Sequence, residues 1–312
     1  AGIGAAARAA PDAKVVVLEA ESQPGYHATG RSAAIFVANY GNAVIRAANA
    51  ASFEELANPP GDLAEAPLLT PRGEMMIATA EEEGLFEEHM AGATSTEEIT
   101  PEEAVARFPT LRRERIQRAC YEAAASDIAV DRLLQGYLRL LRGQGGKLVT
   151  GAGVQAIQRA KGSWEVETAA GRFAGPVIVN AAGAWADDVA KLAGLAPLGL
   201  TPLRRSAAIL PAPEGCDVSG WPAVVSMAET WYAKPEAGKL MVSPADEDPV
   251  EPHDAWADDM VLAEGLERYA QAVTTPVTRV ERTWAGLRTF APDRTPVVGF
   301  DPTAEGFFWL AG

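Results

Sequence analysis

The sequence contains very little cysteine and histidine. Only Cys120 and Cys216 occur, far apart, and there are 3 histidines in 312 residues. No CxxC pair and no Cys/His cluster is present, which argues against a zinc site and against a disulfide framework. We therefore expect no metal ion, and a reducing compartment such as the cytoplasm.

Positive charge is also scarce. Lys and Arg number 27 against 42 Asp and Glu, a net charge of −15. Such a surface is repelled by nucleic-acid phosphates and by anionic lipid. Even the longest apolar candidates, Lys14–Leu18 and Pro176–Trp185, fall well short of the roughly 20 residues that span a bilayer. We expect no nucleic-acid partner and no integral membrane segment, with any membrane contact peripheral, at the inner face.

Helices and strands alternate in the first two thirds of the chain. Val15–Leu18 is a β-branched run typical of a buried parallel strand. Asn42–Leu56 has helical periodicity, Thr100–Glu103 is a capping box with proline at the first helical position, and a helix that Asp131 caps leads into a strand at Lys147–Val149. Residues 203–284 are richer in strand and turn. The length suits about two domains of an α/β protein.

A dinucleotide signal lies at the start of the chain. Glu19 ends the first strand and follows Gly2 by 17 residues, about the distance from the last glycine of a G-x-G-x-x-G turn to the acid that binds ribose. On this interpretation the first two glycines lie upstream, and the chain is clipped at its N-terminus. The spacing suits FAD or NAD equally, and an ordinary helix–strand pair would also have it.

The next segment is far more specific. Glu21–Ala34 (ESQPGYHATGRSAA) resembles the FAD-binding D-amino-acid oxidase family, and within it the bacterial D-arginine dehydrogenase type. Further stretches match in family order over nearly the whole chain: Pro67–Met76, Asn180–Trp185, Pro202–Ser206, Trp284–Phe290 and Glu305–Trp309. This family ends its flavin site with a glycine-rich loop, and the chain stops at Ala311-Gly312, so we expect it to be clipped at the C-terminus too.

The resemblance implies a fold of two interleaved domains. A Rossmann-like FAD-binding domain of the glutathione-reductase type is expected from residues 1–45, 130–200 and 285–312. An α+β substrate domain, built on a mainly antiparallel sheet, is expected from residues 46–129 and 201–284.

The resemblance also implies a set of cofactor residues. Gly2 and Glu19 serve the adenosine half of FAD, and the backbone of Val154 meets the adenine. The expected contacts with pyrophosphate and flavin are Gly30, Arg31, Ser32, Ala33 and Ala34, and the segment that closes over the cofactor includes Ala182, Gly183 and Trp185. For Arg31 a surface salt bridge is the alternative. A histidine comparable to His27 carries flavin covalently in related enzymes, but we expect non-covalent FAD and a packed or hydrogen-bonded His27.

Four residues are candidates for holding an amino acid at the flavin. Arg205 and Arg288 match arginines that the family directs at the substrate carboxylate, for which the guanidinium fork is suited. Tyr232 adds a hydroxyl, and Tyr40 lines the opposite wall. The structural alternatives are surface pairing for the arginines and core packing for the tyrosines. Hydride transfer to flavin needs no metal and no nucleophile.

Glu74 has two interpretations. It enters an apolar strand and needs a cation, which Arg72, two residues before it, could supply. The family resemblance instead places it against the basic side chain of a substrate. The D-arginine dehydrogenase type continues Gly30–Ala34 with His-Tyr, whereas this chain has Ile35-Phe36, so the resemblance leaves the exact substrate open.

Together these features predict FAD-dependent oxidative deamination of D-amino acids, favouring basic ones such as D-arginine. The sequence leaves the electron acceptor open. The alternatives are a glycine or sarcosine type of amine oxidase that uses O2, an NAD-dependent dehydrogenase, and a flavin-binding protein without turnover.

Overall fold

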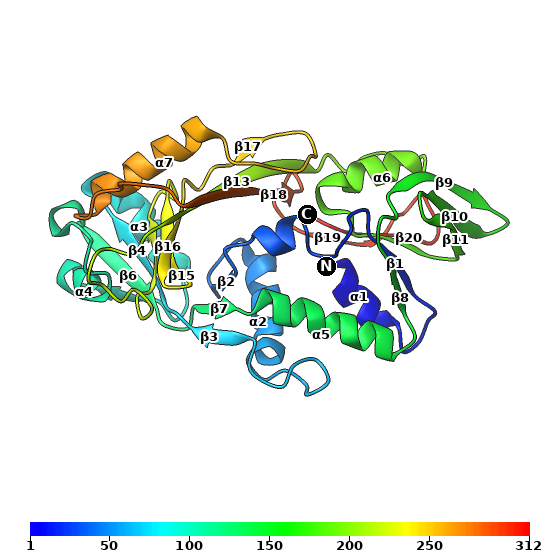
Figure 1. Ribbon diagram of the computed structural model, residues 1–312, viewed down its shortest axis with the longest axis horizontal. Helices are drawn as coiled ribbons and strands as arrows, with labels where there is room; N and C mark the ends of the chain where they lie inside the picture. Colours follow the sequence, from blue (N-terminus) through cyan, green and yellow to red (C-terminus); the bar gives the residue numbers. More distant parts are fainter.

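The computed structural model describes residues 1–312, and the elements gather in two halves along its long axis (Figure 1). One half contains β4, β6, β15 and β16, and the other contains β1, β8 to β11 and α6. The long strands β13 and β18 run between them along the upper side of the view. The two halves are therefore joined by these two strands.

The expected strand–helix–strand step is present near the N-terminus. β1 (Val16–Leu18) pairs in parallel with β8 (Lys147–Val149). α1 (Gly2–Ala9) packs on α5 (Val130–Gly143) through small alanines and Leu141. Ala129 is the N-cap of α5, so Asp131 lies in its first turn and does not cap it.

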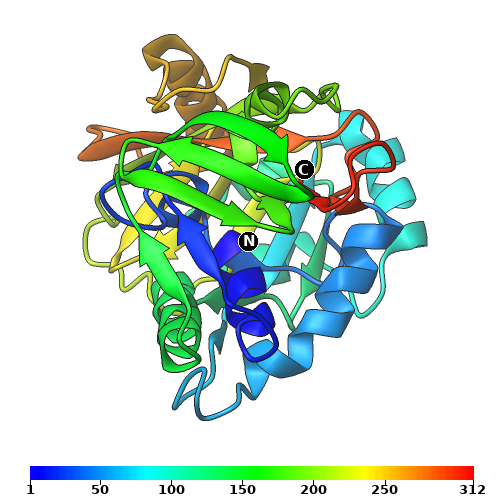
Figure 2. The same cartoon turned by 90° about the vertical axis from the view of Figure 1, so that its right-hand side faces the viewer.

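The rest of this half consists of two three-stranded sheets and a helix. β9 (Val154–Ala160), β10 (Ser163–Thr168) and β11 (Gly171–Gly175) form an antiparallel meander (Figure 2). β12 (Ile178–Asn180) pairs in parallel with β20 (Phe307–Ala311), which pairs antiparallel with β19 (Val297–Phe300). α6 (Ala186–Leu192) joins them, and Trp164, Phe307 and Trp309 fill the shared core. Segments far apart in sequence thus form one unit.

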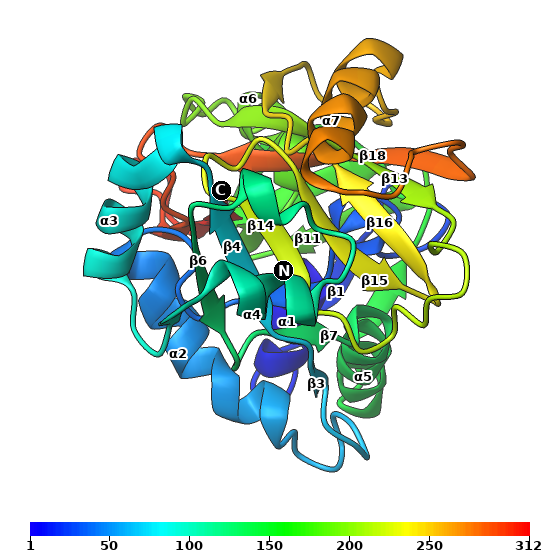
Figure 3. The same ribbon diagram turned by 90° about the vertical axis from the view of Figure 1, so that its left-hand side faces the viewer.

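The other half is built on a nine-stranded sheet (Figure 3). All pairings are antiparallel except β14 with β4, as expected for a mainly antiparallel sheet. Its strands in chain order are β4 (Glu74–Ala78), β5 (Glu97–Ile99), β6 (Arg118–Glu122), β13 (Thr201–Leu210), β14 (Ala223–Ser226), β15 (Tyr232–Glu236), β16 (Lys239–Ser243), β17 (Asp248–Pro249) and β18 (Arg282–Phe290).

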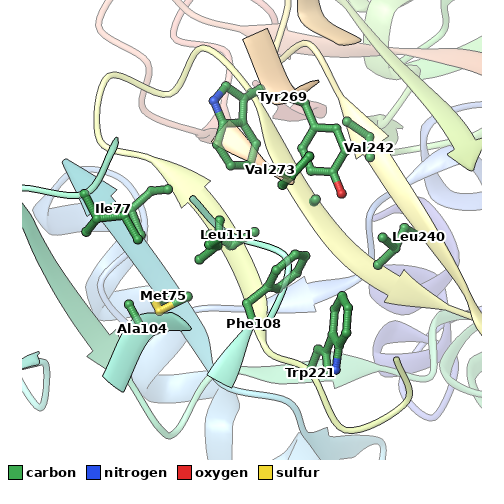
Figure 4. Packing of buried hydrophobic residues seen from close by; sticks show 14 of the residues in the cluster. Met75, Ile77, Ala104, Phe108, Leu111, Trp221, Leu240, Val242, Tyr269 and Val273 are labelled. Carbon is green, nitrogen blue, oxygen red and sulfur yellow. The ribbon is translucent and has the colours of Figure 1, made fainter. Parts of the chain in front are cut away.

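Helices cover one face of this sheet, which we call the outer face. α4 (Pro101–Arg107) has the predicted capping box at Thr100, and α7 (Asp259–Ala272) is capped by Asp258. The largest apolar core fills the space between them and the sheet, with Met75, Phe108 and Tyr269 among its members (Figure 4). α3 (Glu83–Gly92) packs on the opposite, inner face through Phe86.

A further small three-stranded sheet, formed by β2, β7 and β3, lies between the halves. β7 (Ser126–Ile128) pairs with β2 (Ile35–Phe36) and with β3 (Leu69–Pro71). Phe36 is buried, and its ring lies 5.8 Å from that of Phe53 on α2 (Ala43–Ala57). The periodicity predicts this helix, and Asn42 caps it. Ile35-Phe36 thus forms an apolar strand directly after the Gly30–Ala34 segment.

One expected domain boundary falls inside a strand. Residue 285 lies in β18, which pairs with β13 over its whole length. Cutting there would break the sheet, so we propose that the last FAD-binding segment begins after Phe290.

Candidate active site

The inner face of the nine-stranded sheet carries Glu74 and Tyr232. Residues directly paired on neighbouring strands point to the same side, and so do residues two apart on one strand. Glu74 pairs with Ala223 and Tyr232 pairs with Val225, two residues further along β14. The two side chains therefore project from the same face, opposite the one that α4 and α7 cover.

Arg205 and Arg288 project from that face as well. Ser243 pairs with Tyr232, and the pairing of Ala208 with Val242 puts Ser243 opposite Ala207. Arg205 is two residues from Ala207. Arg288 pairs with Leu203, again two residues along. Four of the five predicted substrate residues thus share one face of one sheet.

The two arginines meet a carboxylate of the chain itself. Arg205 donates from Nη2 to Glu247 at 2.9 Å, and Arg288 lies 3.5 Å from the same oxygen. Arg294 donates to both oxygens of Glu247 at 2.8 Å. Arg288 also donates to the hydroxyl of Tyr40. No motif in the sequence points to Glu247 or Arg294.

The charge of Glu247 is fixed by these partners. Its side chain is 32% exposed. Burial alone would raise the pKa of Glu247, but the hydrogen bond and charge of Arg294, with the charges of Arg205 and Arg288, hold that pKa below its ordinary value. Glu247 is therefore an anion at neutral pH.

Glu74 has no cation beside it. Burial, and then the charges of Glu122 and Glu229, raise the pKa of Glu74 to about 8. Arg72 instead holds Asp127, with Nη2 and Nε at 2.6 and 2.8 Å from one carboxylate oxygen. The proposed Arg72–Glu74 ion pair is therefore wrong. Glu74 is a half-buried carboxyl group that lacks a positive partner.

One short segment connects the two ends of this face. Glu122, directly paired with Glu74, accepts hydrogen bonds from the backbone of Ala38 at 2.8 Å and from the side chain of Asn39 at 2.6 Å. The next residue, Tyr40, bonds Arg288. Residues 38–40 therefore reach from the Glu74 end of the face to its arginine end.

The raised pKa of Glu74 predicts a pH-dependent stability. The folded protein holds a proton on Glu74 that the unfolded chain, with a pKa near 4.5, releases. Stability from this group is present below about pH 4.5 and is lost as the pH rises toward about 8. The melting temperature of wild type should fall more steeply across this window than that of Glu74→Gln, in the absence of ligand. Parallel profiles would contradict the assignment, and the exposed Glu264→Gln variant should follow wild type.

The inner face also carries a buried lysine that sequence reasoning missed. Lys234 is 3% exposed, and its Nζ lies 2.9 Å from Asp127 and 3.1 Å from Glu236. Asp127 pairs with Ile35 in the small sheet. Lys234 and Arg72 both bind Asp127 on β7. Lys234 thereby connects the nine-stranded sheet to β7 and its neighbour β2, the strand that follows Gly30–Ala34.

The expected adenosine site is assembled at the start of α1. The first turn of this helix holds no acidic residue, so an anion would meet no like charge there. A Cβ on Gly2 would lie 3.1 Å from that of Ala181, next to the predicted Ala182 and Gly183. Gly183 has a φ of 57° and open space around it. The chain therefore brings these two distant segments together.

Glu19 and Val154 lie near each other, at the end of β1 and the start of β9. Glu19 follows β1, and one of its carboxylate oxygens accepts the backbone N–H of Glu21 at 3.0 Å, which leaves the other oxygen for a ribose hydroxyl. The backbone of Glu19 accepts from Ala152, two residues before Val154 begins β9. This arrangement fits the donors and acceptors of an adenosine group.

The loop that continues toward the substrate face is tightly folded. A Cβ on Gly30 would collide with the carbonyl oxygen of Gly25, whose bond to the Gly30 N–H closes the turn. Ser32 bonds only the carbonyl of Thr29, and Ala34 has a φ of 55°. The Gly30 N–H and the Ala34 carbonyl are thus engaged within the chain, and the small residues Ser32 and Ala33 leave room for a bulky cofactor.

Arg31 has a different environment from the one expected. Its guanidinium donates to the carbonyls of Tyr26, Ala255 and Ala285 and pairs with Asp254. Each of its nitrogens is engaged, so the ion-pair alternative describes the side chain, and only its backbone remains for a cofactor.

His27 is packed and hydrogen-bonded. Its Nε2 lies 2.8 Å from Glu21, and its ring centroid lies 4.7 Å from that of Trp185. Trp185 belongs to the segment that would close over the cofactor, so His27 connects this segment to the loop before Gly30.

This combination defines an FAD-dependent oxidoreductase, and the comparison with known families agrees. A family model described as FAD dependent oxidoreductase (DAO) matches residues 1–312, and the chain belongs to this family. The cradle formed by α1, Glu19 and the Gly30–Ala34 loop fits the cofactor that the family name states. No helix of the chain has the length and apolar character needed to cross a membrane.

Individual relatives are distant. Hydrogen cyanide synthase subunit HcnC of Pseudomonas aeruginosa is 25% identical over 191 residues, which are 58% of this chain and 43% of the relative. The match thus spans less than half of that protein. Glycine oxidase of Geobacillus kaustophilus superposes with a TM-score of 0.85 at 21% identity, covering 100% of this chain and 86% of that one. L-α-glycerophosphate oxidase of Mycoplasma pneumoniae with FAD bound superposes with 0.86 at 15%, covering 99% and 86%. These likenesses support the fold.

Proposed function

We propose that the protein oxidises the Cα–N bond of D-amino acids and prefers those with a basic side chain. The arginine pair with Tyr40 binds the carboxylate, Tyr232 contributes a hydroxyl between the two ends, and Glu74 binds the distal cation. The observation that carries the proposal is the position of Glu74, an unpaired carboxyl group on the same face as Arg205 and Arg288. A site for glycine alone has no use for such a group.

The residues named here bind and orient, and the cofactor supplies the redox chemistry. When bound, FAD accepts a hydride from the substrate Cα. As the hydride leaves Cα, the lone pair of the neutral amine forms the C=N bond of an imino acid. Water then hydrolyses the imino acid to a 2-oxo acid and ammonia. The guanidinium groups fix the carboxylate so that the Cα–H bond is held in one direction. The acidic Glu74 end selects among side chains.

Product analysis tests the reaction. The full-length holoprotein is incubated with D-arginine and an excess of an artificial electron-accepting dye. The proposal expects ammonia and the 2-oxo acid in amounts equal to the dye reduced. Dye reduction without ammonia would exclude oxidative deamination, and no dye reduction by any amino acid would favour a flavin-binding protein without turnover. Turnover with glycine or sarcosine but not with D-arginine would favour the glycine-oxidase type.

We also propose that FAD is bound without a covalent link. The hydrogen bond between His27 and Glu21 and the contact of His27 with Trp185 support a structural role for this ring. Acid precipitation should release all of the flavin into the supernatant, and His27→Ala should release the same fraction. Yellow colour that stays in the wild-type pellet and disappears in His27→Ala would show a covalent bond at this residue.

A further inference from the structure

The arginine end of the active site contains a carboxylate of the chain itself, Glu247, in contact with both arginines. A single oxygen of Glu247 lies 2.9 Å from Arg205 and within 3.5 Å of Arg288. These are the two guanidinium groups that the proposed function assigns to the substrate. Two anions at one arginine pair compete, because each adds repulsion to the other.

The arginine pair is only partly satisfied by this carboxylate. Arg205 uses one terminal nitrogen, and its buried Nε has no hydrogen-bond partner. Arg288 uses its other terminal nitrogen for Tyr40. An arginine fork binds a carboxylate best through two parallel hydrogen bonds, which neither residue forms with Glu247. The pair therefore retains capacity for a second carboxylate in better geometry.

Arg294 is a further partner of Glu247 in the same arrangement. Its Nη2 contacts both carboxylate oxygens at 2.8 Å. The guanidinium centres of Arg288 and Arg294 lie 4.9 and 4.2 Å from the ring centroid of Phe290, so one aromatic ring holds both cations. Glu247 can keep Arg294 as its partner when another anion takes Arg205 and Arg288.

The segment around Glu247 is anchored firmly on the outer side of the sheet. Asp246 accepts hydrogen bonds from the backbone and hydroxyl of Ser206 at 2.6 and 2.8 Å. Asp248 accepts from Arg204 at 2.8 Å. Because both neighbours are fixed, movement of Glu247 is restricted to its own side chain.

We infer that Glu247 is an internal competitor for the substrate carboxylate, which occupies the arginine pair in the empty site and is withdrawn by Arg294 when substrate binds. It acts through the arginines, so it is a positioning residue that sets the affinity and selectivity of the site for carboxylates. The inference rests on the proposed role of Arg205 and Arg288. It predicts that removing the charge of Glu247 strengthens binding, whereas loss of a purely structural residue would weaken it.

The test uses a carboxylate that cannot be oxidised at a C–N bond. Isocaproate is leucine without its amino group, and isocaproamide is the neutral control. Dissociation constants are measured on the holoprotein by calorimetry and by the change in flavin absorbance. Glu247→Gln should bind isocaproate about tenfold more tightly than wild type, as expected for one nearby charge in a partly solvated site. Binding of isocaproamide should not change.

Arg294 and Glu251 provide the matched controls. Arg294→Gln should weaken isocaproate binding severalfold, because Glu247 then remains on the arginine pair. In the double variant with Glu247→Gln this weakening should largely disappear, since Arg294 acts through Glu247. Glu251→Gln removes an exposed carboxylate from the same stretch of chain and should match wild type.

The outcomes separate this inference from the proposed function. Unchanged or weaker isocaproate binding in Glu247→Gln, or no binding to either protein, overturns the inference even if amino acids are oxidised. Tighter binding together with no oxidation of any amino acid would support the competitor role and contradict the proposed function. If Glu247→Gln does not fold, Glu247→Asp decides: its shorter side chain should reach the pair less well and bind isocaproate more tightly than wild type.

Discussion

Glu74→Leu is expected to lower kcat/KM for D-arginine at least about tenfold while leaving D-leucine and D-methionine nearly unchanged. A charged hydrogen bond contributes about 1.5–3 kcal/mol, and a tenfold change corresponds to about 1.4 kcal/mol. Neutral substrates never make this bond, so they do not lose it. Steady-state kinetics with an artificial electron acceptor measures the effect.

The pattern over substrates matters more than the size of the loss. Equal losses for basic and neutral substrates would make Glu74 a structural residue. A wild-type enzyme that ignores D-arginine would show that the Ile35-Phe36 departure has changed the specificity. Glu264→Leu, on the exposed side of α7, is the control and should leave both classes of substrate unaffected.

Arg288→Met is expected to lower kcat/KM at least about tenfold for every amino-acid substrate. The carboxylate is common to all of them, and the loss of one charge-assisted hydrogen bond is about 1.5–3 kcal/mol. Arg205→Met should behave in the same way. Because Arg288 also bonds Tyr40, its replacement removes a contact that fixes the opposite wall.

A residue on the same strand gives the control. Arg282 lies six positions before Arg288 on β18, is exposed, and stacks on Trp284. Arg282→Met should therefore leave kcat/KM nearly unchanged. Unaltered kinetics in both Arg205→Met and Arg288→Met would remove this pair from the site.

The sequence predicts those helices whose starts depend on interactions within their own first turn or on a clear apolar periodicity. The capping box at Thr100 marks the start of α4 because a cap needs only its own first turn, and the periodicity of Asn42–Leu56 marks α2. α7 was not predicted from the sequence, because it lies within residues 203–284, where strand and turn signals prevail. Only Leu262, Gly265 and Tyr269 of its 14 residues are buried, so its apolar face is narrow.

The Arg72–Glu74 pairing failed for a backbone reason. Residues two apart share a face only in a continuous strand. Gly73 has a φ of 73°, and the chain turns there between the end of β3 at Pro71 and the start of β4 at Glu74. Arg72 is directed to Asp127 as a result. A glycine inside a strand pattern often marks a bend, and Gly73 is such a signal in the sequence.

The partners within the arginine cluster could not be read from the sequence. Glu247 stands in a run of acidic residues, Asp246-Glu247-Asp248, and nothing local distinguishes it from its neighbours. The turn at Ala245, with a φ of 54°, and the pairing of β17 with β13 bring it to Arg205. Family resemblance predicted the cations, and only the tertiary arrangement revealed the anion among them.

Anaerobic mixing of the full-length holoprotein with matched amino-acid enantiomers tests the central claim most directly. The yellow absorbance of oxidised flavin should bleach with D-arginine, more slowly with D-leucine, and not with L-arginine. Bleaching by L-arginine alone, or by no amino acid at all, would contradict the account.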